Sequence, residues 1–361
     1  MTMKITVINI SSQHRSGESA IHKAVVELLH HYSAHGFVKH GTEQALKIYP
    51  YQQELSSCDT YINVGGDISP NPYSGYITAN FLNLLKQLNK SPETTFLFGY
   101  SIPDSCNGLA LKLLSHQFKK NSSVAVSDQQ SYKKLTGLGV KCILSYDLAF
   151  LLRPSNHAIK IAAQILNQLR ISRSAVISLA EFKGQYPGGD AGFSKNIGLL
   201  CKQLEQRKYQ PIVLLPAQGH KHEATRRIAQ AIKQQCPKVK ILDLFDYSSQ
   251  IPDWELRQAI VTVSRLIITV CYQTTVLALA AGRTPFNLFY ANEGADLTTR
   301  LGVPGCHVEQ FDYTKSLLPI ELAAQKAFDP LPITQSIRSH FINGLDAYYF
   351  NRVLENNYDL A

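Results

Sequence analysis

Three neighbouring side chains of different chemistry, Cys271, Tyr272 and Gln273, follow a run of β-branched residues in the stretch "TVCYQTTVLALAAGRTPF". The residues after them are rich in alanine and leucine, which favours a helix that begins close to Thr274 and Thr275. In an open α/β sheet, ligands bind where strands end and helices begin, so we expect these side chains to face a ligand. A helix start of this kind can also bind phosphate groups.

The segment "PAQGHKHE", residues 216–223, places two histidines and a lysine at a predicted helix start. His220 and His222 flank Lys221, and Gln218 precedes them. A metal site would need further clustered ligands, which the sequence does not supply, so no metal is expected. Imidazole titrates near neutral pH, so His220 is a candidate for anion binding or for acid–base catalysis. A histidine that caps a helix is the structural alternative.

Two glycines, Gly188 and Gly189, stand in the segment "YPGGDAGFSKN", just before a predicted helix. Glycine lets a ligand approach the backbone closely, and a helix N-terminus carries partial positive charge. Lys183 and Lys195 lie on either side of the pair. The loop therefore resembles a phosphate-binding loop, although it has neither the spacing of the P-loop nor that of the G-x-G-x-x-G motif.

A second glycine pair, Gly65 and Gly66, follows the strand-like run "CDTYINV" and precedes Asp67. Glycines at such a position allow a positive φ and a close approach to a ligand. The Asp67 carboxylate could accept hydrogen bonds from sugar hydroxyls. A tight turn explains the same three residues equally well.

Strand-like runs alternate with helical patterns along the chain, which predicts βαβ units on parallel sheets. Strands are expected at residues 4–10, 58–66, 94–102, 122–128, 141–147, 174–181, 210–218, 239–245, 265–272 and 285–290. The expected fold class is α/β, with two doubly wound Rossmann-like domains that face each other across a cleft. Their expected bounds are 1–169 and 170–330, and residues 331–361 are expected to form a helix that packs across both domains.

The composition limits the classes of partner. Of 361 residues, 45% are hydrophobic and 17% are charged, which is typical of a globular protein. The net charge of +9 indicates an anionic partner: a phosphorylated substrate, a polyanion or an acidic membrane surface. Basic residues form no run longer than two, so nucleic acid is not expected as a partner.

The start of the chain lacks the features of a signal peptide, and no segment is apolar enough to span a membrane. We therefore expect a cytoplasmic chain, for which peripheral contact with the inner membrane surface stays open. Seven scattered cysteines without a C-x-x-C pair predict neither zinc nor disulfides, and no cofactor is expected.

Several segments occur in an order and spacing that are found in one protein family. They are "SGESAIHKAVVELL", "CDTYINVGGD", "FLFGYSI", "SVAVSDQQSYKKLTGLGV", "YDLAFLL", "IVLLPAQ" and "WELRQAIVTVSRLIITVCYQTTVLALAAGRTPFNLFY". Over most of its length, from Lys4 to Leu301, the chain resembles the polysaccharide pyruvyl transferase family. The most specific pieces are "SDQQSYKKLTGLGV" and "TTVLALAAGRTPF".

The resemblance implies the two-domain GT-B architecture, with the acceptor side in residues 1–169 and the donor side in residues 170–330. It also implies a reaction, in which the enolpyruvyl unit of phosphoenolpyruvate moves onto saccharide hydroxyls, usually as a ketal, during synthesis of cell-surface polysaccharides. Cations must hold the phosphate and carboxylate of this donor, and an acid must protonate its enol carbon. The family supplies an arginine and a histidine in an R-x-H motif after a late strand, and a lysine after the next strand.

The chain departs from this family pattern at the donor site. Cys271 stands at the position of the family arginine, Gln273 at that of the histidine and Glu293 at that of the lysine. Ser127 replaces a further arginine that is usual in the family. The loss of an arginine and a lysine removes two charge-assisted contacts of about 1.5–3 kcal/mol each, and a glutamine cannot protonate carbon.

Three hypotheses for the function stay open. The first is a pyruvyl transferase whose donor site has moved, with new cationic groups drawn from Lys183, Lys195, His220, Lys221, Arg226 and Arg283. The second is a GT-B glycosyltransferase with a nucleotide-sugar donor, whose phosphates would lie at Gln273, Thr274 and Thr275. The third is a saccharide-binding protein without catalysis. In both transferases the acceptor is a saccharide or a lipid-linked saccharide, and the sequence does not indicate the oligomeric state.

The predicted site residues fall into three groups. His220 and Gln273 are the catalytic candidates. Donor or phosphate binding is assigned to Lys183, Gly188, Gly189, Lys195, Gln218, Lys221, His222, Cys271, Thr274, Thr275, Tyr290 and Glu293. Acceptor binding is assigned to Gly65, Gly66 and Asp67 and to Arg15, Gly17 and Glu18, which stand where the family often has an N-x-G-D motif.

Overall fold

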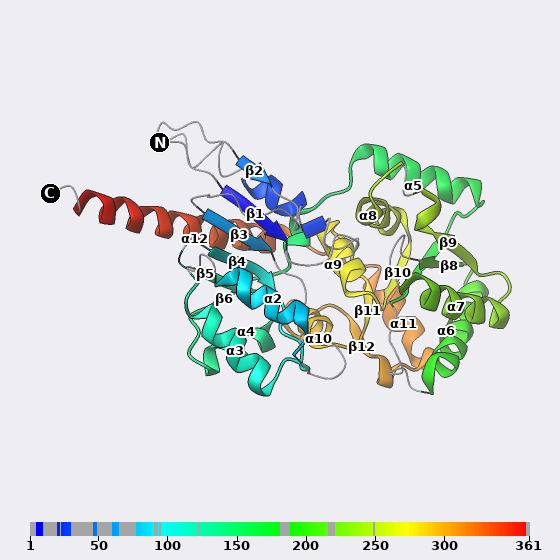
Figure 1. Cartoon of the computed structure of the whole chain (residues 1–361). Coiled ribbons are helices and arrows are strands. Elements are labelled where there is room, and N and C mark those ends of the chain that lie inside the picture. The colour runs from blue at the N-terminus through cyan, green and yellow to red at the C-terminus, as the bar shows by residue number, and fades with distance from the viewer. Residues whose placement is uncertain are drawn as a thin grey trace. The chain divides into compact units, whose positions relative to one another are not determined.

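A computed structural model gives the fold of the chain. It describes residues 5–9, 20–21, 23–29, 46–48, 60–64, 77–89, 93, 95–121, 123–180, 188–215, 221–247 and 250–358. The contacts between Cα atoms divide the chain into two compact units (Figure 1). The first unit comprises strand β1 (Ile5–Asn9), the described residues between Ile21 and Leu148, and the C-terminal helix α12 (Leu331–Tyr358). The second unit comprises Ala149–Pro330 together with the short range His14–Ala20, of which the structure describes Ala20.

The sheet of the first unit is parallel throughout its described strands. Its strand order is β2 (Leu46–Ile48), β1, β3 (Thr60–Val64), β4 (Thr95–Tyr100), β5 (Ser123–Val126) and β6 (Ile143–Leu144). The chain moves outward from β1 to β2 and then returns to add β3 on the other side of β1. This reversal is a topological switch point, where ligands bind in doubly wound sheets.

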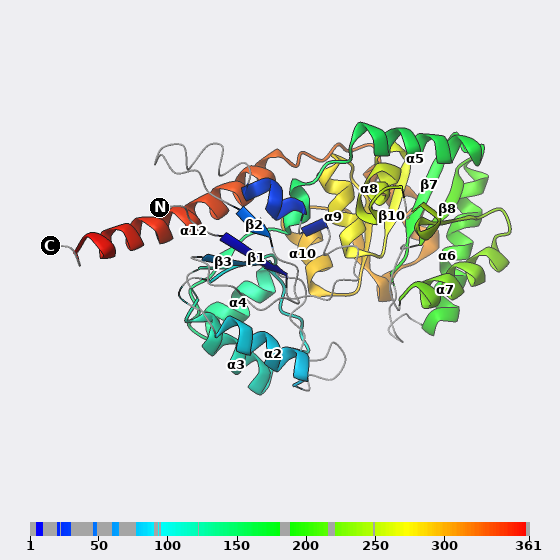
Figure 2. The same cartoon turned by 45° about the horizontal axis from the view of Figure 1, so that its top comes forward.

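Helices α2 (Ala79–Leu88), α3 (Gly108–Phe118) and α4 (Gln129–Gly137) connect β3 to β6 in succession and cover one face of this sheet (Figure 2). They lie on one face because right-handed crossovers that advance in one direction all fall on the same side. Leu97 of β4 is buried beneath these helices. Phe98, the next residue of the strand, points to the opposite face, where its ring lies 5.0 Å from that of Phe341 in α12.

The sheet of the second unit is also parallel in its described strands. Its strand order is β12 (Gly305–His307), β11 (Phe286–Phe289), β10 (Leu266–Thr269), β7 (Ser174–Ser178), β8 (Gln210–Leu215) and β9 (Lys240–Asp243). The first strand of the unit, β7, is central, and the direction reverses between β9 and β10. This is the Rossmann order, with its switch point between β7 and β10.

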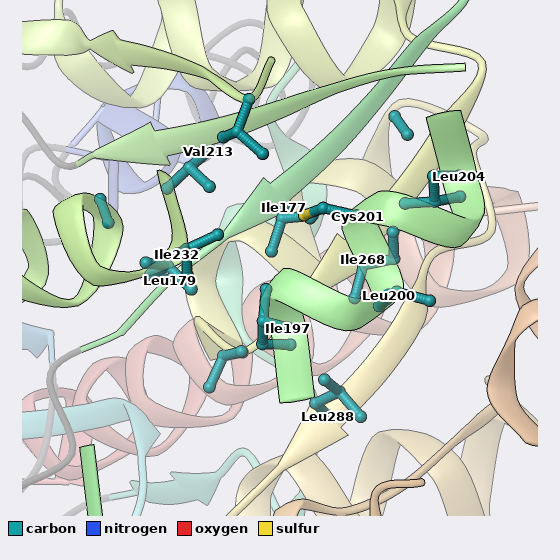
Figure 3. Packing of buried hydrophobic residues seen from close by; sticks show 14 of the residues in the cluster. Ile177, Leu179, Ile197, Leu200, Cys201, Leu204, Val213, Ile232, Ile268 and Leu288 are labelled. Carbon is teal, nitrogen blue, oxygen red and sulfur yellow. The ribbon is translucent and has the colours of Figure 1, made fainter. Parts of the chain in front are cut away.

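Helices cover both faces of the second sheet. On one face, α6 (Gly189–Gln206), α7 (Lys221–Gln235) and α11 (Tyr313–Ala323) form a core that includes Ile177, Cys201 and Ile268 (Figure 3). On the other face, α5 (Asn156–Gln168), α8 (Asp253–Val263) and α9 (Tyr272–Ala280) pack on Val176 and Ile267. Helix α10 (Asn292–Leu301) joins β11 to β12, and short 3-10 turns lie at Leu148–Leu151, Leu244–Tyr247 and Val308–Gln310.

The expected fold class is confirmed: the chain is an α/β protein built on two doubly wound, Rossmann-like sheets. The division between the units falls at Ala149, whereas the sequence placed it at residue 170. The difference arises from α5, because Ala158 and Ile165 of this helix are buried against Val176 in the second sheet. The cleft between the domains and the packing of the C-terminal helix across both stay predictions.

Candidate active site

Helix α9 begins at the switch point of the second unit. Strand β10 ends at Thr269, and Cys271 is the N-cap of α9 with an extended backbone (φ −80°, ψ 114°). The Cys271 side chain makes no capping hydrogen bond, and Cys271, Tyr272 and Gln273 are all half-buried. A helix N-terminus has partial positive charge and attracts anions. The Cys271 side chain has no oxygen that could accept hydrogen bonds from the backbone N–H groups at this end of the helix.

A buried cation, Arg257 of α8, lies beside this helix start. Its Nη2 donates to Oδ2 of Asp253 at 2.6 Å, and the two side chains are 4% and 7% exposed. Its Nη1 donates to Thr274 Oγ1 at 3.3 Å and lies 3.6 Å from Cys271 Sγ. Among the described residues, no acceptor is within hydrogen-bond distance of its buried Nε. The guanidinium therefore lies between a carboxylate and the first turn of α9.

The surroundings keep this guanidinium charged. Burial lowers the pKa of Arg257, but the Asp253 carboxylate and the Cys271 sulfur raise it, and the net pKa is above its ordinary value. Asp253 offsets part of the positive charge. Because the carboxylate binds Nη2 while Nη1 faces α9, the positive end of the ion pair points toward the helix start.

The two threonines of α9 connect the helix to the sheet. Both Thr274 and Thr275 are 0% exposed. Thr274 Oγ1 lies 2.8 Å from Ser178 Oγ in β7, and Thr275 Oγ1 lies 2.8 Å from Thr269 Oγ1 in β10. Thr275 Oγ1 also donates to Oδ1 of Asn287 at 3.3 Å. Both hydroxyls therefore face the sheet and are hydrogen-bonded there, and the assignment of Thr274 and Thr275 to donor binding stays a prediction that rests on the helix start.

Asn287 of β11 fixes the first turn of α10 next to α9. Its Nδ2 donates to the Gly294 carbonyl at 2.9 Å. A Cβ at Gly294 would lie 2.6 Å from Cβ of Phe289, so glycine is needed for the helix to start this close to the strand. Tyr290 and Glu293 stand in this strand-to-helix turn, half-buried. Since β11 pairs with β10, the predicted lysine position at Glu293 follows the strand next to the start of α9.

Helix α6 begins on the other side of the switch point, after β7. Gly188 is its N-cap with φ 72°, and Gly189 has φ 67°, a left-handed conformation that favours glycine. Lys195 is exposed in the second turn of the helix. The two glycines therefore have a structural explanation, and the start of α6 is a second positive helix end at the same switch point.

Several predicted site residues lie outside the described residues: Arg15, Gly17, Glu18, Gly65, Gly66, Asp67, Lys183, Gln218 and His220. Lys221 and His222 form the first turn of α7, whose side chains are likewise not described there. Helix α7 follows β8, and β8 pairs with β7 at the switch point.

Two of the alternative cations have structural partners. Arg226 donates to the Asp243 carboxylate at 2.5 Å. Arg283 donates to the carbonyls of Thr262 and Ser264 at 3.2 and 2.8 Å, and both burial and the charge of Arg265 lower its pKa. Because Arg283 follows the C-terminal end of α9, at the edge of the sheet away from the switch point, the structure does not support it as a donor-binding cation.

The sequence reasoning missed Arg257 and Asn287. Arg257 stands four residues after Asp253 in a helix whose following residues are mostly apolar, and Asn287 interrupts the apolar strand "FNLF". A polar side chain inside an apolar run needs a hydrogen-bond partner when it is buried, so the sequence indicates a buried polar contact at both positions.

The family of the chain can be stated from its sequence. A family model for polysaccharide pyruvyl transferases matches residues 8–258, more than half of the chain. The chain belongs to this family. Membership assigns it to the transferases. The matched range includes Arg257 and ends one residue later, so Cys271, Gln273 and Glu293 lie beyond it, and their correspondence to the family positions stays a prediction.

Solved structures with a similar fold include nucleotide-sugar enzymes. S. aureus MnaA, solved with UDP, has a TM-score of 0.53 at 11% identity, and the alignment covers 97% of each chain. OtsA in its apo form has a TM-score of 0.53 at 9% identity, with 96% of this chain and 98% of that chain covered. The UDP-GlcNAc 2-epimerase of Methanocaldococcus jannaschii gives 0.50 at 12% identity, with 94% and 98% covered. At such identities the likeness shows the fold alone, which is GT-B-like.

No curated protein matches the sequence. Within the described part of the chain, no helix is long and apolar enough to cross a membrane. In the same residues, no group of three or more histidine, cysteine, aspartate or glutamate side chains is placed to hold a metal ion.

Proposed function

We propose that the chain transfers the pyruvyl unit of phosphoenolpyruvate to a saccharide in cell-surface polysaccharide synthesis, and that the donor binds at the start of α9. Family membership supports the reaction. Arg257 carries the assignment of the site, because its guanidinium stands beside Cys271, where the family arginine is expected. A hydrogen bond from a charged group to the donor would contribute about 1.5–3 kcal/mol.

The reaction needs one proton donor and a stabilised leaving phosphate. The enol carbon of phosphoenolpyruvate accepts a proton, and a saccharide hydroxyl adds to the oxocarbenium-like C2 as it loses its own proton. Departure of phosphate and addition of a second hydroxyl, again with loss of a proton, give the ketal and inorganic phosphate. Arg257 and the N-terminus of α9 would stabilise the phosphate charge as the C–O bond breaks.

Proton transfer is assigned to His220. This residue directly precedes α7, after the strand that pairs with β7, and imidazole titrates near the pH of the reaction. Gln273 would orient the donor by hydrogen bonding. The acceptor, a saccharide or a lipid-linked saccharide, is assigned to the sequence segments that follow β1 and β3. These segments contain Arg15, Gly17, Glu18, Gly65, Gly66 and Asp67.

A ligand panel with the wild-type chain tests the donor. Phosphoenolpyruvate and UDP, CMP and GDP sugars are added separately, and the melting temperature is measured. A donor at 100 times its Kd adds about 2.7 kcal/mol of stability. We expect stabilisation by phosphoenolpyruvate, and release of inorganic phosphate when a polysaccharide acceptor is added. Stabilisation by a nucleotide sugar alone would contradict the proposal.

A nucleotide-sugar donor is the second candidate. The Rossmann order of the second sheet favours it, as does the presence of UDP in the similarly folded MnaA structure. A free nucleoside diphosphate would then stabilise the chain in the same panel. Binding of an oligosaccharide without any donor and without phosphate release would instead indicate a saccharide-binding protein.

A further inference from the structure

The outer surface of helices α2, α3 and α4, called the α2–α4 layer below, carries cationic side chains and no acidic ones. None of the three helices contains an aspartate or a glutamate. The exposed basic side chains on the helices and directly after α3 are Lys86, Lys112, His116, Lys119, Lys120 and Lys133.

Two exposed leucines belong to the same layer. Leu109 of α3 is 64% exposed and Leu82 of α2 is 50% exposed. Along α3, Leu109, Lys112 and His116 are spaced by three and four residues, so they form one stripe on the solvent side of the helix. An exposed leucine beside lysines offers an anionic bilayer an apolar contact and a charge contact on the same side of the helix.

Contacts at the C-terminal ends hold the three helices together as one surface. Lys120 Nζ donates to Asn89 Oδ1, directly after α2, at 3.4 Å. Lys119 Nζ approaches the C-terminal side of α4, where it would lie 3.5 Å from a Cβ at Gly139. The three helices are neighbours on one face of the first sheet (Figure 2). The exposed lysines therefore belong to neighbouring helices on one face of the sheet.

Helix dipoles explain only part of this charge. Lysines in the last turn complement the negative end of a helix, and this accounts for Lys86 and Lys119. Lys112 and Lys133 lie in mid-helix, where the dipole gives no such preference. Two exposed carboxylates flank the helices: Asp104, in the loop before α3, is paired with Lys134 at 2.8 Å, and Glu93 lies in the segment after α2. The six exposed basic side chains outnumber these two.

We propose that the α2–α4 layer docks on an anionic lipid bilayer, with the lysines against lipid phosphates and the two leucines at the level of the headgroups. Charge complementarity selects this partner, because a layer with lysines and no carboxylates is attracted to a surface of negative charge. The exposed leucines favour a bilayer over a soluble polyanion. This inference does not depend on the identity of the donor.

Vesicle binding tests the proposal. The full chain is sedimented with vesicles of phosphatidylcholine alone and with vesicles that also contain phosphatidylglycerol. We expect binding to the second kind only, weakened by salt. Each lysine near an anionic membrane contributes about a fivefold change in affinity. The change Lys86→Gln, Lys112→Gln and Lys119→Gln should therefore weaken binding about 100-fold.

A matched control separates this surface from the overall charge. The change Lys202→Gln, Lys233→Gln and Lys238→Gln removes as many exposed lysines from the second unit and should leave vesicle binding unchanged. The pair Leu82→Ser and Leu109→Ser should reduce the binding that persists at high salt. Equal loss in both lysine variants, no binding of the wild type to anionic vesicles, or capture by heparin or DNA in place of vesicles would each overturn the proposal.

Discussion

Two helices that begin at the carboxyl ends of strands, one in each sheet, differ in the group that interacts with the partial positive charge of their N-terminus. Helix α4 follows β5 in the first unit, and its N-cap Asp128 is 2% exposed. The Asp128 carboxylate accepts hydrogen bonds from Ser131 N at 2.8 Å, Ser131 Oγ at 2.5 Å and Ser101 Oγ at 3.0 Å. Helix α9 follows β10 in the second unit, and its N-cap Cys271 makes no such bond.

The difference separates a structural helix start from a candidate binding site. At α4, a carboxylate of the chain itself occupies the position that an anionic ligand would take. At α9, no side-chain cap occupies this position, and the Arg257 guanidinium beside it adds to the positive charge of the helix end. A strand-to-helix turn becomes a candidate anion site when its own capping anion is missing. Substitutions at both helix starts test this interpretation.

The largest effect is expected from Arg257→Met. The change leaves the Asp253 carboxylate buried without its partner, which costs about 3–5 kcal/mol when one member of a buried ion pair is removed. Urea unfolding measures the loss. The double change Asp253→Asn with Arg257→Met removes both charges and should recover much of the stability.

The same double variant tests the site. Because it folds without the guanidinium, its affinity for phosphoenolpyruvate should fall at least tenfold in calorimetry, as a charged hydrogen bond of about 1.5–3 kcal/mol is lost. An unchanged affinity would show that Arg257 only supports the fold.

Asp128→Ala should cost about 1–3 kcal/mol of unfolding free energy, because it removes the cap of α4 and leaves the Ser101 and Ser131 hydroxyls without their acceptor. Asp128→Asn keeps an acceptor oxygen and should cost less. Neither change should alter donor affinity. A loss of donor binding in Asp128→Asn would remove the distinction between the two helix starts.

The triple change Cys271→Arg, Gln273→His and Glu293→Lys restores the family residues at the predicted positions. Two added cations and the loss of one carboxylate should raise the affinity for phosphoenolpyruvate about tenfold or more in calorimetry. Gln273→Ala in the wild-type background is the control. Tight binding by the wild type that disappears in this control would show that the present residues already form the donor site.

The smallest effect on stability is expected from Cys271→Asp, which gives α9 the same type of cap as α4. A carboxylate at the N-cap should stabilise the chain by about 0.5–1 kcal/mol in thermal unfolding, since the backbone there is already extended. The same carboxylate should repel phosphoenolpyruvate. Cys271→Ser, which can cap without a charge, should keep any donor binding. Donor binding that survives in Cys271→Asp would place the donor elsewhere.

Periodicity in the sequence was sufficient to predict the longer strands of both sheets. The runs at residues 94–102 and 265–272 contain β4 and β10. Strands β2 and β12 have three residues each, too few for an alternating pattern, and both were missed. The unit boundary was misplaced because the amphipathic pattern of α5 does not specify which sheet the helix covers.

The candidate site was only partly predictable from the sequence. The turn at Cys271 was expected, because the change from a β-branched run to an alanine-rich segment marks the end of a strand. The role of Arg257 could not be read from its neighbours, since its contact with Cys271 depends on how α8 packs against α9. Sequence alone does not show which side of a helix faces the sheet, so the hydrogen bonds that the Thr274 and Thr275 hydroxyls make to the sheet could not be predicted.

Helix α12 has a consequence for the order in which the chain can fold. All residues of the second unit, His14–Ala20 and Ala149–Pro330, precede α12 in the sequence, whereas the first unit needs α12, whose Phe341 and Leu345 are fully buried. A ribosome releases α12 last. During synthesis the second unit can therefore complete its core before Phe341 of α12 is available to pack against Phe98. The first unit can therefore complete its core only after the second, and a premature stop near residue 330 removes α12 from the core of the first unit alone.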